Sequence, residues 1–243
     1  MEKITPSHTG QTPPPPEILS RQQLDTILQN PDRTPESVLN FFDGKFQKEL
    51  DADAGVHEGY TIREHTAMVM GQYYKYLRSE LPDSVNPEVF EVILALHDIG
   101  KSQAIRNGDK TQQHQFTTPL LKETMTELGF DDEDIQFATA LTDGDPIGAV
   151  LQTGDTSGNA HKITKMVAHS GLGIEDFWQA LQVYYKADAG SYTRDAGGQP
   201  SLDFLFEFNP VGGKMSFSPD TQVVVKAIEH ALPLDAAEPT AQP

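Results

Sequence analysis

Apolar residues recur at three- to four-residue intervals along most of this chain, the spacing that places them on one face of a helix. The pattern predicts helices over residues 21–30, 36–46, 64–81, 89–100, 120–129, 133–142, 174–188 and 221–232. Only one segment, near the C-terminus, argues for strands.

The predicted helices carry start signals. Thr61 with Glu64 three residues later forms a capping box, in which each side chain accepts a hydrogen bond from the other residue's backbone N–H. Other helices are predicted to open on a proline after a capping Thr, Asn or Ser, because the fixed backbone angle of proline suits the first helical position. These prolines are Pro35, Pro87, Pro119 and Pro219.

The strand signal and the chain ends complete the predicted fold. Residues 202–208 and 214–217 flank an Asn-Pro-Val-Gly-Gly turn and predict a β-hairpin, whereas residues 154–160 predict a flexible loop. Residues 1–17, with a run of prolines, and residues 234–243, rich in Ala and Pro, predict disordered tails. We therefore expect a mainly α protein, one helical bundle over residues 18–233 with a small C-terminal β-hairpin.

Charge and composition narrow the function. The chain has 36 acidic residues against 18 Lys and Arg, a formal charge of -18 that disfavours long nucleic acids and anionic membrane surfaces as partners. A small phosphorylated substrate stays open, because a bound divalent metal can reverse the local field. Without cysteine, any metal ligands must be His and carboxylate. The sequence has neither an export signal nor an apolar run of about 18 residues, so the cytoplasm is the expected location.

A candidate metal site stands at the end of an apolar helix. His97 and Asp98 come just before Gly100, which we expect to end the helix. Adjacent side chains diverge by about 100° on a helix, so both can face one ion only across a helix tip. The partial negative charge of a helix C-terminus also favours a cation there.

The pair has further candidate ligands on either side of it. His65 lies on an earlier predicted helix and Asp188 near the end of a later one, in the sequence YYKADAGSY. With the string HDIGK this order resembles the HD-domain superfamily of metal-dependent phosphohydrolases, over roughly residues 57–191. The resemblance implies an HD-type helical bundle and a divalent metal (Mn, Mg, Fe, Co or Ni) held by His65, His97, Asp98 and Asp188. Asp195 is the alternative to Asp188.

A second metal is an open question. Some branches of this superfamily add histidines between the His-Asp pair and the last aspartate, and His114 has a suitable position for the first of them. No histidine follows it at the next expected place, where Asp143 and Asp145 stand instead. A carboxylate suits a hard second ion, so one or two metals remain possible.

The resemblance favours hydrolysis of a phosphomonoester or phosphodiester in a small metabolite or nucleotide. Lys101 is placed to neutralise a phosphate, and Asp109 or Asp143 to act as general acid or base. One alternative is the HD branch of mixed-valence di-iron oxygenases, which Tyr60 and Glu64 near the first histidine would suit. Another is a sensor that binds a metal and a nucleotide without turnover.

Overall fold

The computed structural model describes residues 19–209 and 211–233. Its α-helices are α1 (Arg21–Leu28), α2 (Pro35–Phe41), α3 (Asp43–Leu50), α4 (Ile62–Gln72), α5 (Pro87–Leu96), α6 (Lys101–Arg106), α7 (Gln113–Glu127), α8 (Asp132–Leu141), α9 (Pro146–Thr153), α10 (Thr156–Ser170), α11 (Ile174–Gly190) and α12 (Pro219–Ala231). The predicted mainly α fold is confirmed. The tails predicted over residues 1–17 and 234–243 lie outside the described residues.

Short helical turns connect several of these helices. The chain leaves α4 through a π-helical turn, η1 (Tyr73–Leu77), and a 3-10 turn, η2 (Arg78–Glu80), so residues 62–80 are helical as the sequence predicts. The other 3-10 turns are η3 (Lys110–Gln112), η4 (Arg194–Ala196) and η5 (Asp203–Leu205).

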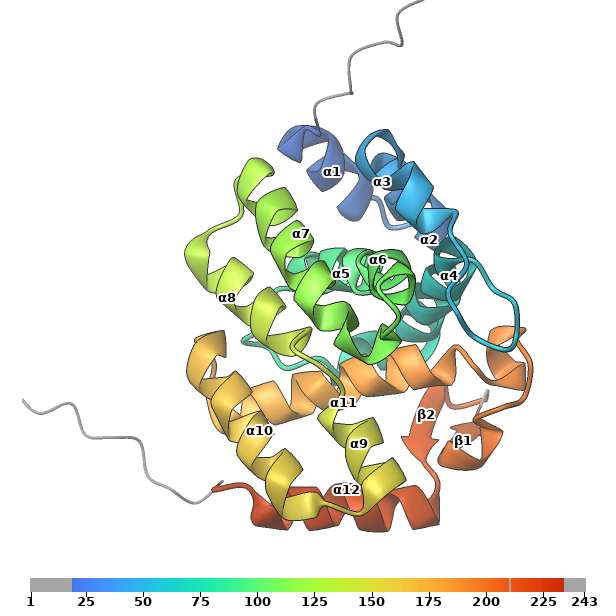
Figure 1. Cartoon of the computed structure of the whole chain (residues 1–243), viewed down its shortest axis with the longest axis vertical. Helices are drawn as coiled ribbons and strands as arrows, with labels where there is room; N and C mark the ends of the chain where they lie inside the picture. Colours follow the sequence, from blue (N-terminus) through green and yellow to red (C-terminus); the bar gives the residue numbers. More distant parts are fainter. Residues whose placement is uncertain (1–18, 210, 234–243) are drawn as a thin grey trace, which may run out of the picture.

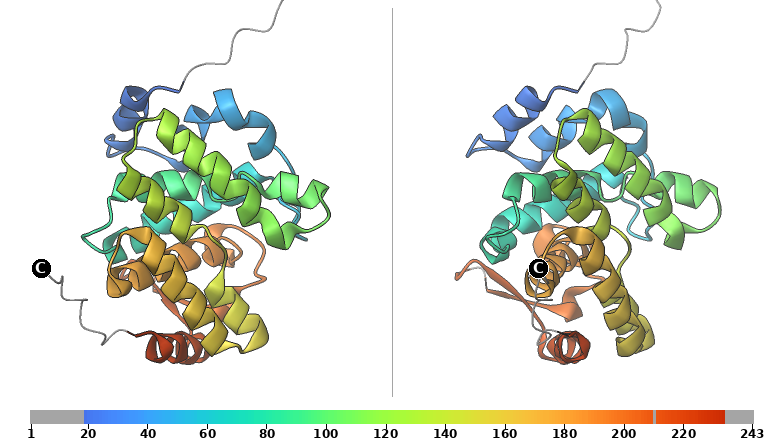
Figure 2. Two further views of the ribbon diagram at one scale, coloured as in Figure 1. Left: turned by 60° about the vertical axis from the view of Figure 1, so that its left-hand side comes forward. Right: turned by 90° about the vertical axis from the view of Figure 1, so that its left-hand side faces the viewer.

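Helices α5 and α11 organise the core. Every residue of α5 from Val89 to Leu96 is buried, as expected for a helix that is apolar on all sides. Helix α11 crosses the middle of the molecule and packs against α4, α9 and α10 (Figure 1). Both views in Figure 2 place α1–α3 at one end of the molecule and α12 at the other. Helix α4 packs against both α5 and α11, so the helices that carry the candidate ligands meet between these two ends.

One acidic residue is buried within α5. Glu91 has no exposed surface, yet its carboxylate accepts hydrogen bonds from both Arg33 Nε, at 2.7 Å, and Arg33 Nη2. Tyr74 donates its hydroxyl hydrogen to the same carboxylate at 2.9 Å. We call these three residues the Glu91 cluster. A buried charge is tolerated when it is paired and hydrogen-bonded, and this one ties the loop before α2 to the core.

The hairpin follows the prediction with a shorter first strand. Strands β1 (Phe206–Asn209) and β2 (Lys214–Phe217) pair antiparallel with Phe206 opposite Phe217. Residues 203–205, predicted as strand, form η5 instead. The Ser218 side chain caps α12 as its Ser-Pro signal predicts.

Several predicted boundaries are wrong. Helix α7 starts at Gln113 rather than after Thr118, and Pro119 sits inside it. Pro119 has no N–H to donate to the carbonyl of Gln115, but Gln115 is exposed, so water can replace that partner. The loop predicted at residues 154–160 is the start of α10, because Asp155 accepts a hydrogen bond from the Gly158 N–H and caps the helix.

Further differences concern short helices. The predicted helix 36–46 divides into α2 and α3 at Phe42. Helices α6 and α9, each eight residues or fewer, were not predicted because a segment of two turns shows too little periodicity. Among residues 19–209 and 211–233, no helix combines the length and the apolar composition needed to cross a membrane.

Candidate metal centre

His65 is held in the second turn of α4. The capping box at the start of this helix is present: Glu64 N donates to Thr61 Oγ1 at 3.1 Å, and Thr61 N donates to Glu64 Oε2 at 2.8 Å. The box fixes where the helix begins and therefore which residues face inward. The side chain of His65 points into the core and has no exposed surface.

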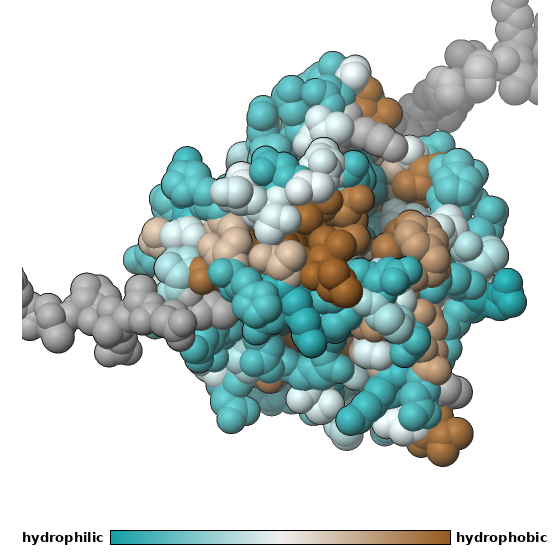
Figure 3. Space-filling view, turned by 90° about the horizontal axis from the view of Figure 1, so that it is seen from below, coloured by the Kyte–Doolittle hydropathy of each residue, from teal (hydrophilic) through white to brown (hydrophobic). Residues whose placement is uncertain are grey.

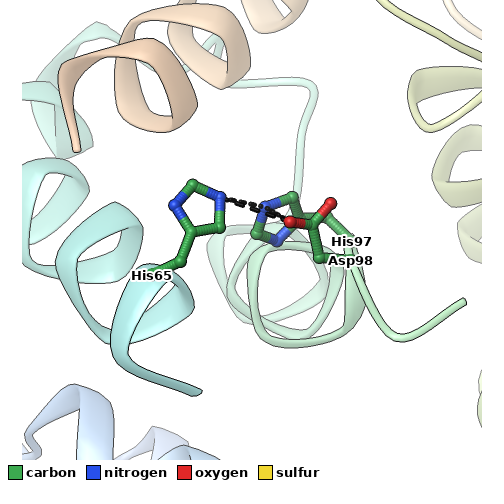
Figure 4. A group of neighbouring side chains, drawn as sticks. All are labelled: His65, His97 and Asp98. Atoms are coloured by element: carbon green, nitrogen blue, oxygen red, sulfur yellow. Dashed lines mark hydrogen bonds and ion pairs between the residues drawn. The ribbon is translucent and has the colours of Figure 1, made fainter. Parts of the chain in front are cut away.

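His97 and Asp98 lie at the tip of α5, both 2% exposed. The helix ends at Leu96 and His97 is its C-cap, so the chain is already turning at Asp98 and the two side chains can meet in front of the helix end. Figure 4 shows His65 facing this pair across the gap between α4 and the end of α5. The two side chains meet His65 across the helix tip, as the sequence predicts, and the three residues form a group that could hold a metal ion.

Gly100 does not end the helix as predicted. Its φ is -85°, a value open to any residue, and it is the N-cap of α6. Glycine is needed there because a Cβ would collide with the backbone of Phe116 and Thr117 in α7. Gly100 N also donates to Thr117 Oγ1 at 3.2 Å, so this glycine docks α7 beside the His-Asp pair.

Asp188 reaches the same point from α11. Its Oδ1 lies 3.0 Å from His65 Nε2 and 3.7 Å from His97 Nε2. The Asp188 side chain is 35% exposed, whereas the two histidines and Asp98 are buried. The cluster therefore has a closed side on α4 and α5 and an open side at Asp188. We call His65, His97, Asp98 and Asp188 the metal-site cluster.

The donor atoms of His65, His97 and Asp98 have the spacing of ligands around one ion. His65 Nε2 lies 3.4 Å from His97 Nε2 and 3.3 Å from Asp98 Oδ2, and His97 Nε2 lies 3.8 Å from Asp98 Oδ2. Ligands bound at about 2.1 Å are spaced by roughly 3.0 Å in an octahedral site and roughly 3.4 Å in a tetrahedral one. The buried His65, His97 and Asp98 alone form a group able to hold a metal ion.

Hydrogen bonds on the far side of each ring assign the histidine tautomers. His97 Nδ1 lies 2.7 Å from the Leu94 carbonyl oxygen, which can only accept, so Nδ1 carries the proton. Ser191 Oγ donates to the Asp188 carbonyl oxygen at 2.6 Å and is left to accept from His65 Nδ1 at 3.1 Å. Both Nε2 atoms therefore direct lone pairs at the carboxylates. Such an arrangement requires a cation among them, a metal ion or protons on the rings.

Asp98 is fixed by two polar side chains. Lys101 Nζ donates to Asp98 Oδ2 at 2.8 Å and Gln113 Nε2 donates to Asp98 Oδ1 at 2.9 Å. Burial alone would raise the pKa of Asp98, but the positive charge of Lys101, together with that of the two imidazoles in their protonated form, holds it down at about 2. Asp98 is thus an anion throughout the physiological pH range.

The other ligands show the same electrostatic balance. Burial opposes the charged form of His97, but the neighbouring Asp98 and Asp188 carboxylates outweigh it and raise the pKa of His97. Burial likewise acts to raise the pKa of Asp188, and the two imidazoles hold it well below its ordinary value. The site stabilises positive charge at its centre and negative charge at its edge.

A cavity of about 530 Å³ opens on the exposed side of the cluster. His97, Lys101 and Asp188 form its floor, and α7 and α9 form its walls. A volume of this size accommodates a small metabolite or a nucleotide. A separate recess of about 420 Å³ between α1 and α2 is lined, among the described residues, by no ionisable side chain.

None of the residues predicted for a second metal belongs to the metal-site cluster. His114 lines the wall, while its neighbour Gln113 makes the bond to Asp98. Asp143 and Asp145 are both exposed; Asp143 lies outside the lining, whereas Asp145 lines the cavity and caps α9 through the Gly148 N–H at 2.8 Å. Loss of hydration in this recess raises the pKa of Asp145 to about 6, although the residue keeps contact with solvent.

Other predicted candidates serve local structure. Asp109 accepts hydrogen bonds from Thr111 N and Oγ1 at 2.9 and 2.6 Å and belongs to a turn outside the cavity lining. Asp195, the alternative final ligand, instead contacts Lys75 at 3.0 Å and Tyr76 at 2.9 Å.

The two residues that suggested an oxygenase form hydrogen bonds outside the metal-site cluster. Glu64 is exposed in its capping box, and the Tyr60 hydroxyl accepts from Gln199 N at 2.8 Å.

Sequence reasoning did not find three residues that support the cluster. Gln113 and Ser191 orient Asp98 and His65, and the ring of Tyr192 stacks on His65 with centroids 4.9 Å apart. Ser191 and Tyr192 stand three and four residues after Asp188, just past the end of α11, and this proximity was a usable signal. No sequence pattern pointed to Gln113, because its hydrogen bond to Asp98 depends on how α7 packs.

The fold and the site geometry stand without support from known proteins. No protein-family model, curated protein or solved structure matches the chain.

Proposed function

We propose that this protein is a metal-dependent phosphohydrolase that acts on a small phosphorylated metabolite or nucleotide. The observation that carries the proposal is that the Asp98 and Asp188 carboxylates each lie 3.0–3.8 Å from the Nε2 atoms of both His65 and His97, beside a cavity that His97 and Asp188 line. The order of His65, the His97-Asp98 pair and Asp188 along the chain is also the order of the HD resemblance.

The donor set fits a divalent metal. Two imidazoles and two carboxylates are borderline and hard ligands, which suit Mn, Fe, Co or Ni, and Mg less well. A metal bound there supplies a water with lowered pKa and polarises a phosphoryl oxygen. In hydrolysis the water oxygen bonds to phosphorus, the ester P–O bond breaks and the leaving oxygen departs with a proton.

Side chains of the protein would bind the phosphate and protonate the leaving oxygen. The cluster is buried except at Asp188, so the phosphate approaches from the cavity past this residue. Lys101 lines the cavity while its ammonium holds Asp98, and it brings positive charge to the floor where a phosphate binds. Asp145 stands on the cavity wall with its raised pKa and is the best placed proton donor for a leaving oxygen.

The test is a metal-reconstitution screen. Chelator-stripped protein is reloaded with Mn, Co, Fe, Ni or Mg and assayed on phosphomonoesters, nucleotides and cyclic dinucleotides. We expect turnover with at least one metal and its loss in Asp98→Ala, while Asp220→Asn, an exposed carboxylate on α12, keeps it. Binding without turnover in every combination would instead support a nucleotide sensor, and two irons with oxygen consumption would support an oxygenase.

A further inference from the structure

A second recess adjoins the cavity beside the metal-site cluster. It has a volume of about 310 Å³ and lies between α9, the end of α11 and η5. Asp145, Gln152, Tyr185 and Asp188 line both spaces, so a molecule held at Asp188 can extend from one into the other. The two spaces act as a single bipartite site with Asp188 at the division.

The two parts differ in chemistry. The first contains Lys101 and His114 among its lining residues. The described lining of the second contains no Lys, Arg or His; its charged residues are the shared Asp145 and Asp188, and the rest of its wall is largely apolar or aromatic. A phosphate is favoured in the first part, where Lys101 lies, and finds no cationic side chain in the described lining of the second. The second part therefore suits an uncharged, apolar group.

An exposed aromatic side chain stands in the second recess. Phe204 is 71% exposed, and it lines this space opposite Leu151 of α9. Tyr192 lines the same recess and stacks on the ligand His65, which places an aromatic wall next to the metal-site cluster. Figure 3 shows hydrophobic side chains gathered in the middle of the lower face of the molecule, surrounded by hydrophilic ones. Covering an exposed phenyl ring with another planar ring removes apolar surface from water and adds a stacking contact.

We propose that this recess is the subsite for the leaving group, and that the leaving group carries an uncharged aromatic ring, of the kind present in a nucleoside. Phe204 stacks on the ring and the Gln152 amide, at the boundary of both parts, hydrogen-bonds its polar edge. The substrate class is then a phosphomonoester of a ring-bearing alcohol, with the phosphate at Asp188 and the ring at Phe204. This inference rests on the proposed hydrolase function.

The test compares Phe204→Ala with Val223→Ala, which removes a similarly exposed hydrophobic side chain (68%) from α12 outside the recess. Adenosine 5′-monophosphate, phenyl phosphate and glycerol 2-phosphate are the substrates. Base–aromatic stacking predicts that Phe204→Ala raises KM about tenfold or more for the two ring-bearing esters and leaves KM for glycerol 2-phosphate unchanged. Val223→Ala should change none of the three. Equal KM values across substrates, or equal effects of Phe204→Ala on all three, would overturn the subsite.

A binding measurement separates this inference from the proposed hydrolysis. Saturation-transfer NMR with adenosine and uridine, which carry no phosphate, is expected to detect binding to the wild type and to Val223→Ala, and at least fivefold weaker binding to Phe204→Ala. If the nucleosides do not bind the wild type, or bind Phe204→Ala and Val223→Ala equally, the subsite is contradicted, whatever the hydrolysis screen shows. If nucleosides bind at Phe204 but no metal supports hydrolysis, the proposed hydrolase function is contradicted while the binding subsite is supported.

Discussion

Two clusters of buried charge in this protein have opposite electrostatic balances. In the Glu91 cluster one carboxylate receives two N–H groups of Arg33 and the hydroxyl of Tyr74. In the metal-site cluster two carboxylates and two imidazole lone pairs converge, and Lys101 and Gln113 supply protein donors to only one of the carboxylates. The Glu91 cluster is complete within the protein, whereas the metal-site cluster needs an added cation.

The comparison separates a structural use of buried charge from a functional one. A buried carboxylate with a full set of donors stabilises a particular packing and has no capacity left for a ligand. A buried site with more hydrogen-bond acceptors than donors destabilises the folded chain until a metal ion or protons bind. Such a site is typical of a place where a ligand binds. The following predictions test this difference, from the largest expected effect to the smallest.

The largest effect is expected at the Glu91 cluster. Arg33→Met removes both guanidinium hydrogen bonds to the buried Glu91 carboxylate and leaves it only the Tyr74 hydroxyl and the more distant Arg78, at 3.8 Å. This change should reduce the free energy of unfolding by about 3–5 kcal/mol. Urea denaturation measures the loss, and isothermal titration with Mn²⁺ should show unchanged affinity. A variant that unfolds normally but loses its metal would show that the two clusters are not independent.

The next effect concerns metal binding and stability. Free Mn²⁺ at 100 to 1,000 times its Kd should stabilise the wild type by about 2.7–4.1 kcal/mol, because only the folded chain assembles the four ligands. Thermal unfolding with and without a chelator measures this gain. Asp98→Asn should lose it, while Asp220→Asn should keep it; equal stabilisation of all three proteins would place the metal elsewhere.

A smaller effect is expected behind the ligands. Ser191→Ala removes the acceptor for His65 Nδ1 and should weaken metal affinity by about 10–100-fold, as other substitutions behind metal ligands do. Ser84→Ala, which removes an exposed hydrogen bond to Asp176 Oδ2, is the matched control and should leave affinity unchanged. Equal affinities in the wild type and Ser191→Ala would show that this bond does not orient the ring.

The smallest effect is a pH dependence of the metal-free protein. The folded pKa of His97 is raised, so its contribution to stability is complete below the unfolded value of about 6.5 and is lost as pH rises through the folded pKa. Metal affinity should rise over the same range, because the proton and the metal compete for Nε2. Urea titrations of chelator-stripped protein from pH 6 to 9 check the sign; stability that rises with pH would refute the assigned balance.

The sequence predicted the parts of this molecule that depend on local chemistry. The caps at Thr61, Asn86 and Ser218 predicted where three helices begin, and α5 was evident from its apolar run. The order of His65, His97-Asp98 and Asp188 predicted a cluster that the structure brings together. Each of these features is carried by residues adjacent in sequence or by the resemblance.

The parts that depend on packing between distant segments could not be predicted. Gly100 was expected to end a helix, but its lack of a side chain lets α7 approach, and that approach places Gln113 rather than His114 at Asp98. The recess beside Asp188 arises where α9 meets η5, about 50 residues apart in the chain. No short-range pattern encodes such contacts.

X-ray absorption spectroscopy of Mn²⁺-loaded protein tests the central claim most directly. The account predicts one tightly bound ion with two imidazole nitrogens and carboxylate oxygens in its first coordination shell, and loss of one imidazole in His65→Ala. A first shell made of oxygen ligands alone, or a spectrum unchanged in His65→Ala, would contradict the assignment of this cluster as the metal centre.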